Sequence, residues 1–62
     1  MLYIYNYINI KKLKSNFIVI DYDLGNLCIK GSNLIIKSLY KEYIVIKGDI
    51  NEISFNKGIY ND

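Results

Sequence analysis

Short runs of hydrophobic residues close to period two dominate the chain. Six hydrophobic runs fall within 62 residues, five of them close to period two, and β-branched and aromatic side chains are frequent in each. Alternation of this kind places one set of side chains on one face of a β-strand, which these residue types also favour. A helix over residues 35–46 is disfavoured by its length, its β-branched residues and the flanking Gly31 and Gly48. We therefore predict an all-β fold, a small antiparallel meander of five or six strands forming a twisted sheet or partly closed sandwich.

The hydrophobic runs also set the expected domain limits. The first covers residues 2–10 and ends at a lysine-rich break over residues 11–16. The later runs cover residues 17–20, 27–30, 33–37, 43–47 and 49–55. We predict a single β domain at residues 1–57 and a frayed C-terminal tail at residues 58–62.

Turn chemistry predicts a strand register. Gly31–Ser32 suits a two-residue type II′ turn, because glycine supplies the positive φ of the first central position. A four-residue loop over residues 22–25 and a further loop after Lys37 complete the meander. The predicted cross-strand pairs are Ile18–Ile29, Ile20–Leu27, Ile29–Leu34, Leu27–Ile36, Ile36–Ile44 and Leu34–Ile46. One parity rule then places eight residues on a single face: Ile18, Ile20, Leu27, Ile29, Leu34, Ile36, Ile44 and Ile46.

The opposite face of the predicted sheet also carries large hydrophobic residues. A lone antiparallel sheet usually presents one polar face to water, so we expect these residues to contact another chain. The predicted interface residues are Phe17, Val19, Ile35, Tyr43 and Val45. Glycines at turns or bulges are predicted at Gly25, Gly31 and Gly48.

The residue types present argue against an enzyme. The chain has one cysteine and no histidine, so it lacks an internal disulfide and has a poor ligand set for zinc. Asp21 and Asp23 are expected to be solvated turn residues, and Cys28 a half-buried structural thiol. We predict no catalytic residues, no cofactor and no metal site. The sequence shows no signal peptide or membrane-spanning run, and we expect a cytoplasmic protein.

Tyrosines with interspersed lysines suggest one alternative function. Small β-modules bind single-stranded nucleic acid by stacking bases on aromatic residues within a basic groove. Tyr3, Tyr5 and Tyr7 would supply the stacking surface, with phosphate contacts from Lys30, Lys37 and Lys47. Because the net charge is only +2 and no RNA-binding signature is present, nucleic acid is the less favoured partner.

The aliphatic residues and glycines follow a defined spacing. It reads Gly25-x-Leu27-x-Ile29-x-Gly31-x-x-Leu34-x-Ile36-x-x-Leu39, followed by Ile44-x-Ile46-x-Gly48-x-Ile50-x-x-Ile53-x-Phe55. This spacing resembles that of the YabP/YqfC sporulation family. Residues 3–10 also resemble the first conserved strand region of the YqfC branch, so the chain is closer to YqfC. The family's usual N-terminal segment is not found before this stretch, and the turn before Gly25 is altered. We therefore expect a short paralogue, a truncated product or a wrongly assigned start.

The resemblance implies a small non-enzymatic protein of endospore-forming bacteria. It would act in sporulation as a structural or assembly factor through protein–protein contacts, in the mother cell. The implied partners are a like chain, giving a homo-oligomer, and a membrane-associated sporulation protein that would hold the chain at the membrane periphery. No small-molecule substrate is implied. A degenerate fragment without function is the remaining alternative.

Overall fold

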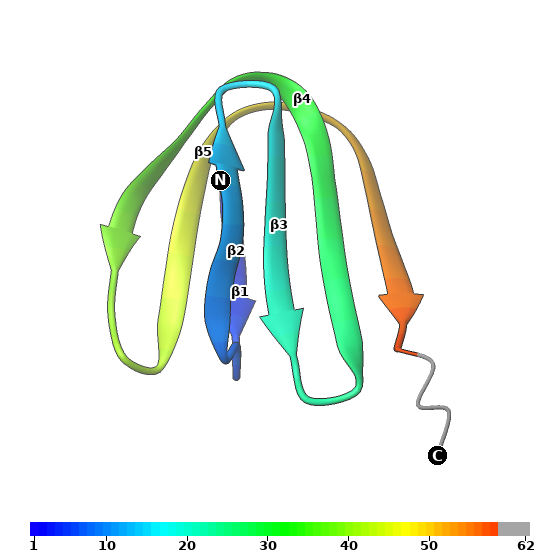
Figure 1. Cartoon of the computed structure of the whole chain (residues 1–62). Coiled ribbons are helices and arrows are strands. Elements are labelled where there is room, and N and C mark those ends of the chain that lie inside the picture. Colours follow the sequence, from blue (N-terminus) through cyan, green and yellow to red (C-terminus); the bar gives the residue numbers. More distant parts are fainter. Residues whose placement is uncertain (59–62) are drawn as a thin grey trace.

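The computed structural model describes residues 1–58, which form five β-strands and no helix (Figure 1). The strands are β1 (Leu2–Tyr5), β2 (Asn9–Lys14), β3 (Phe17–Tyr22), β4 (Gly25–Leu39) and β5 (Tyr43–Lys57). All pair antiparallel in one sheet of order β1-β5-β4-β3-β2, which is not closed. The predicted all-β antiparallel fold is therefore confirmed. Of the predicted tail, the Gly58 N–H donates a hydrogen bond to the Leu24 carbonyl at 2.7 Å, and residues 59–62 lie outside the described residues.

No helix in residues 1–58 is long and apolar enough to cross a membrane.

The N-terminal run divides into two strands, unlike the single run predicted for residues 2–10. β1 ends at Tyr5, and Asn6 has a φ of 59°, a left-handed conformation in which asparagine is enriched. β2 continues to Lys14 through the predicted break, with a register shift between Ile10 and Lys12. The lysines suit this position because charged residues on an edge strand discourage pairing with another chain.

The hairpin turn predicted at Gly31–Ser32 is wrong, because both residues lie inside β4. β4 and β5 are each 15 residues long and pair along most of their length. Ile29 consequently lies opposite Ile53 rather than Leu34. Two predicted strands merge in β4 and two in β5, and Figure 1 shows both long strands arching over together.

The two long strands bend where Gly31 and Gly48 allow their backbones to approach closely. A Cβ at Gly31 would collide with the Asp49 carbonyl oxygen, and one at Gly48 would lie 2.6 Å from the Asn33 carbonyl oxygen. Gly48 also has a φ of 138°, which residues with a side chain rarely adopt. The pairing shifts register at three places between Lys30 and Ser38, and such bulges bend strands. Gly31 and Gly48 therefore occupy a bend, whereas Gly25 begins β4 after the turn from β3.

The predicted hydrophobic face forms the core of the protein. Leu27 and Ile36 pack, partly buried, against the six buried members of that face: Ile18, Ile20, Ile29, Leu34, Ile44 and Ile46. Ile4 of β1 completes the buried cluster. The alternation of side chains therefore predicted the inside of the molecule, even where the strand connections differ.

The register confirms the first hairpin and corrects the others. Ile18–Ile29 and Ile20–Leu27 pair as predicted. Ile29–Leu34 and Leu27–Ile36 are wrong because all four residues lie in the single strand β4. Ile36–Ile44 and Leu34–Ile46 are wrong because bulges shift the β4–β5 pairing and place Ile36 opposite Ile46. For Ile36 the shift is two residues, which keeps the same side chains on the same face.

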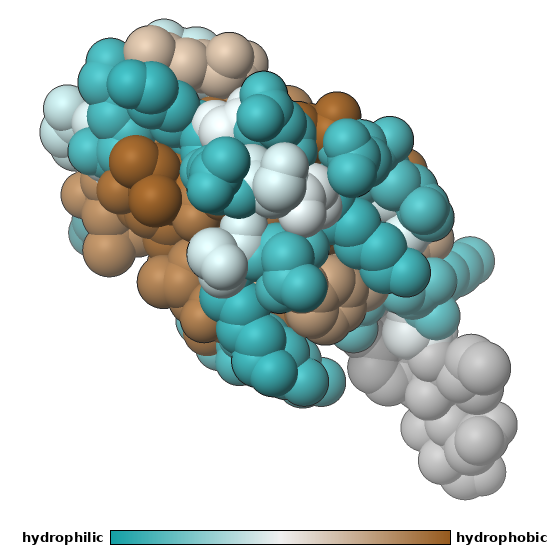
Figure 2. All heavy atoms as spheres, turned by 90° about the horizontal axis from the view of Figure 1, so that it is seen from above, coloured by the Kyte–Doolittle hydropathy of each residue, from teal (hydrophilic) through white to brown (hydrophobic). Residues whose placement is uncertain are grey.

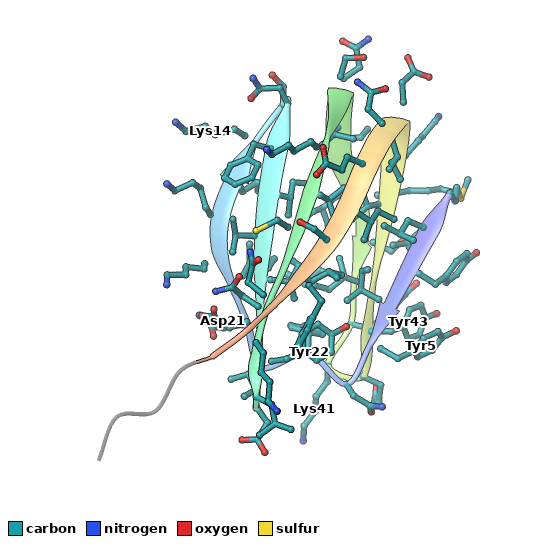
Figure 3. The ribbon with its side chains drawn as sticks, turned by 90° about the vertical axis from the view of Figure 1, so that its right-hand side faces the viewer. Tyr5, Lys14, Asp21, Tyr22, Lys41 and Tyr43 are labelled. Carbon is teal, nitrogen blue, oxygen red and sulfur yellow. The ribbon has the colours of Figure 1, made fainter. Side chains whose placement is uncertain are left out.

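Bending the β4–β5 pair folds the sheet into two layers around the core. The first layer contains β2, β3, the first half of β4 and the second half of β5. The second layer contains β1, the first half of β5 and the second half of β4, and Figure 3 shows the layers side on. Figure 2 looks onto the bend, where mostly hydrophilic residues are seen and hydrophobic ones gather along one flank. Each layer thus has an inner surface against the core and an outer surface facing away.

Substituting Gly31→Ala should destabilise the fold by about 1–3 kcal/mol, because the added methyl group meets backbone atoms in a packed site. Thermal and urea unfolding followed by circular dichroism measures the effect. Ser32→Ala is the matched control, since Ser32 is exposed and adjacent, and it should change stability by less than about 0.5 kcal/mol. Equal stability of the two variants would contradict the close approach of β4 and β5.

Candidate functional site

Among residues 1–58, the ionisable side chains do not assemble into a metal site. Within residues 1–58, no group of three or more His, Cys, Asp or Glu side chains is placed to hold a metal ion. Cys28 is half-buried; its Sγ accepts a hydrogen bond from Asn56 Nδ2 at 3.4 Å and lies 3.8 Å from Asn26 Oδ1. Reactive thiols usually lie beside a cation, whereas both of these contacts are with neutral amides. These contacts therefore give no indication that the Cys28 thiol is reactive.

The five predicted interface residues are divided between the two layers. Phe17 and Val19 lie on β3 in the first layer, and Ile35, Tyr43 and Val45 lie in the second. Val19 and Val45 are buried, Phe17 and Tyr43 are half-buried, and Ile35 is exposed. Because the outer surfaces of the layers point away from each other, the structure brings Tyr43 and Val45 together but places Phe17 and Val19 on the other side.

Four tyrosines gather on the outer surface of the second layer, and we call Tyr3, Tyr5, Tyr40 and Tyr43 the tyrosine surface. The Tyr43 ring is central, with its centroid 4.8 Å from that of Tyr40, 5.2 Å from Tyr5 and 6.1 Å from Tyr3. Pairing of β1 with β5 sets Tyr5 opposite Tyr43, and Figure 3 shows the two together. Tyr3, Tyr5 and Tyr40 remain 51%, 56% and 49% exposed. A contiguous aromatic surface therefore faces solvent.

Sequence reasoning identified only part of this surface. It grouped Tyr3 and Tyr5 with Tyr7, but β1 ends before Tyr7, whose ring packs against the core and whose hydroxyl donates a hydrogen bond to the Tyr40 carbonyl at 2.7 Å. It missed Tyr40, which follows β4 and whose N–H donates to the Tyr43 carbonyl at 2.9 Å. The available signal was the spacing Tyr40-x-x-Tyr43, since a tight turn brings residues three apart close together.

The lysines considered for nucleic-acid binding do not surround the tyrosine surface. Lys30 lies in the first layer, and Lys47 lies four residues from Tyr43 along β5, about 13 Å away. Lys37 extends toward the other end of β1, with its Nζ 3.8 Å from Met1 Sδ. Single-strand binding needs stacked aromatics inside a basic groove, and this arrangement does not provide one.

A shallow hollow of about 470 Å³ lies over the first layer, and its lining residues are Lys14, Asn16, Phe17, Lys30, Gly31 and Asn51. Lys14 and Lys30 lie opposite Phe17 on the two neighbouring strands, so the hollow has an aromatic residue between two cations. Such an arrangement attracts anions. Glu52 of β5 lies opposite Lys30, and its negative charge weakens the attraction of anions.

Crowding on the tyrosine surface raises the pKa of Tyr43 above the usual 10.0. Partial burial is the largest cause, followed by the negative charges of ionised Tyr40, Tyr5 and Tyr3 and of Glu42. The folded protein thus holds the Tyr43 proton more tightly than the unfolded chain does. The resulting stabilisation is complete below the ordinary tyrosine pKa and is lost as the pH rises through the raised value.

Tyr43→Phe should remove this pH dependence while keeping the ring. Stability of the wild-type protein should decline more steeply than that of Tyr43→Phe as the pH rises past 10.0, measured as urea midpoints at a series of pH values. Burial also raises the pKa of Tyr22, so ultraviolet absorbance should show the late-ionising component of the wild type reduced by one tyrosine in the variant, with the Tyr22 contribution remaining. Parallel declines in stability would contradict the crowding of Tyr43.

Comparison with known proteins gives one family. The sequence model of the YabP family matches residues 1–61 of the 62-residue chain. No curated protein and no solved structure matches. The family match covers all the stretches on which the resemblance was based and confirms it, whereas the closer likeness to the YqfC branch stays a prediction. The chain therefore belongs to the YabP family, and that membership indicates a sporulation-related protein.

Proposed function

We propose that this chain is a non-enzymatic structural or assembly factor of endospore formation that acts through protein–protein contacts. Family membership supports the link to sporulation. The proposed setting is the cytoplasm of the mother cell, where the chain contacts like chains or a membrane-associated sporulation protein and so lies at the membrane periphery. These contacts, rather than a chemical reaction, are the proposed activity.

The observation that carries the contact role is the tyrosine surface. Tyrosine is enriched in protein interfaces because it offers a large, rigid contact area with a polar end. The rings of Tyr40 and Tyr5 pack against that of Tyr43 in tilted arrangements and are held by strand pairing and a tight turn, so little conformational freedom is lost when a partner binds. Such a surface suits a protein partner better than a small molecule, since small-molecule sites are enclosed, whereas Tyr3, Tyr5 and Tyr40 are about half exposed.

A deletion in the source organism tests the proposal, scored by heat-resistant spore counts. The wild-type gene should restore the counts, and the double variant Tyr40→Ser/Tyr43→Ser should leave them near the level of the deletion strain. The matched conservative variant Tyr40→Phe/Tyr43→Phe keeps the rings and should restore most of the count. Immunoblots of each strain establish that the variants accumulate to equal levels.

Leu24→Ser serves as the control for loss of exposed hydrophobic area. Leu24 is 59% exposed and lies in the turn between β3 and β4, away from the tyrosine surface. It should complement fully. Normal spore counts in the deletion strain would refute the sporulation role, and full complementation by the double serine variant would refute the role of the tyrosine surface.

A further inference from the structure

A row of three side chains crosses the outer surface of the first layer near the bend. Lys14 of β2 pairs with Phe17 of β3, and Phe17 pairs with Lys30 of β4. Directly opposite residues of neighbouring strands project from the same face. That face is the outer one, because Ile18, which follows Phe17, is fully buried in the core. The backbones of the two lysines lie two strand spacings apart, about 10 Å, so an aromatic side chain lies between two cations.

These three residues line the hollow of about 470 Å³ described above, together with Asn16, Gly31 and Asn51. Phe17 is half-buried and supplies an apolar floor, whereas Lys14 and Lys30 are exposed. Their long, flexible stems can bring an ammonium group to either side of the floor. Asn16 and Asn51 are also exposed and add neutral amide groups to the rim. The volume lies in the range of small-molecule sites.

Backbone hydrogen bonds hold the walls of the hollow in place. The Gly31 N–H donates to the Asn16 carbonyl at 3.1 Å, and the Leu34 N–H donates to the Ser15 carbonyl at 2.7 Å. These two bonds tie the turn between β2 and β3 to β4 at the bend. Asn51 lies at a register shift of the β4–β5 pairing, so strand pairing on both sides positions its backbone. Because the walls are already ordered, little conformational freedom is lost when a ligand binds.

Charge around the hollow is mostly positive. Lys12 lies two residues from Lys14 on β2 and pairs with Val19, on the same outer surface. Glu52, opposite Lys30 on β5, is the negative member of the row. Three lysines against one glutamate favour an anionic ligand. Glu52 also limits its size, because a polyanion that continued across the sheet past Lys30 would meet a like charge.

We propose that this hollow binds a small planar anion, an aromatic ring that carries two carboxylate groups on opposite sides. The ring packs on the Phe17 side chain, and one carboxylate contacts each of Lys14 and Lys30. The amide N–H groups of Asn16 and Asn51 donate to the same carboxylate oxygens. The positions of the two cations on either side of an aromatic residue set this requirement, since a ligand with one charge would use only one of them.

The anion site goes beyond the proposed function, because it lies on the outer surface of the first layer and the tyrosine surface lies on that of the second. Figure 3 shows Lys14 on the side of the molecule away from Tyr5 and Tyr43. A ligand in the hollow therefore leaves the tyrosine surface open to a protein partner. Spore counts test the tyrosine surface and binding to purified protein tests the hollow, so either proposal can fail alone.

The test is an NMR titration of the full chain with benzene-1,4-dicarboxylate. Binding should shift the ring signals of Phe17 and the amide signals of Asn16, Gly31 and Asn51. Benzoate, which has one carboxylate, and adipate, which has two but no ring, should each bind about tenfold more weakly. No binding at millimolar ligand, equal binding of benzoate, or shifts confined to the tyrosine surface would overturn the proposal. Tighter binding of a short single-stranded oligonucleotide at the same residues would also overturn it.

Variants at exposed positions locate the site without disturbing the core. Lys14→Gln and Lys30→Gln should each raise the Kd of the dicarboxylate about fivefold. Lys57→Gln is the matched control, because it removes the same charge at the other end of β5 and should leave the Kd unchanged. Glu52→Gln removes the competing charge and should lower the Kd about threefold. Phe17→Leu should weaken the aromatic ligand but not adipate. Equal losses for Lys14→Gln and Lys57→Gln, or weaker binding by Glu52→Gln, would overturn the proposal.

Discussion

The close approach of the β4 and β5 backbones at Gly31 and Gly48 determines the architecture of this protein. Side-chain-bearing residues there would meet the carbonyl oxygens of Asp49 and Asn33, so only glycine lets the two strands remain paired through the bend. If the strands ended there, the chain would form a flat meander with both faces in water. Because they continue, one hairpin contributes to both layers and encloses the isoleucine face.

Enclosing that face separates the chemistry of the two sides of the sheet. The inner side holds aliphatic residues such as Ile18, Ile29 and Ile44, all fully buried. The outer side differs between the layers, with Phe17 between lysines on the first and the tyrosine surface on the second. For a chain this small, whose fold hides only about 60% of the surface of its unfolded form, much of the apolar area remains available to partners.

The sequence predicted the strands and the core face well but misassigned how the strands connect. Alternation identifies the same buried residues in any two registers that differ by an even number of residues, because a shift of two residues leaves every side chain on its face. Gly31–Ser32 satisfies the local requirements of a type II′ turn, and nothing in the neighbouring residues reveals that Gly31 instead faces Ile50. That choice depends on pairing between residues about twenty positions apart, which local turn chemistry does not report. Tyr3, Tyr5 and Tyr43 of the candidate site lie in strands that the alternation predicted. Tyr40 lies in a loop and becomes part of the surface only through the tight turn to Tyr43.

Backbone NMR contacts across the long hairpin test the central claim most directly. A continuous, bent β4–β5 hairpin predicts nuclear Overhauser contacts that join Ile29 to Ile53 and Gly31 to Ile50. A turn at Gly31–Ser32 would instead join Ile29 to Leu34. Finding the first set would establish the bend on which both layers depend, and finding the second would contradict the folded two-layer sheet.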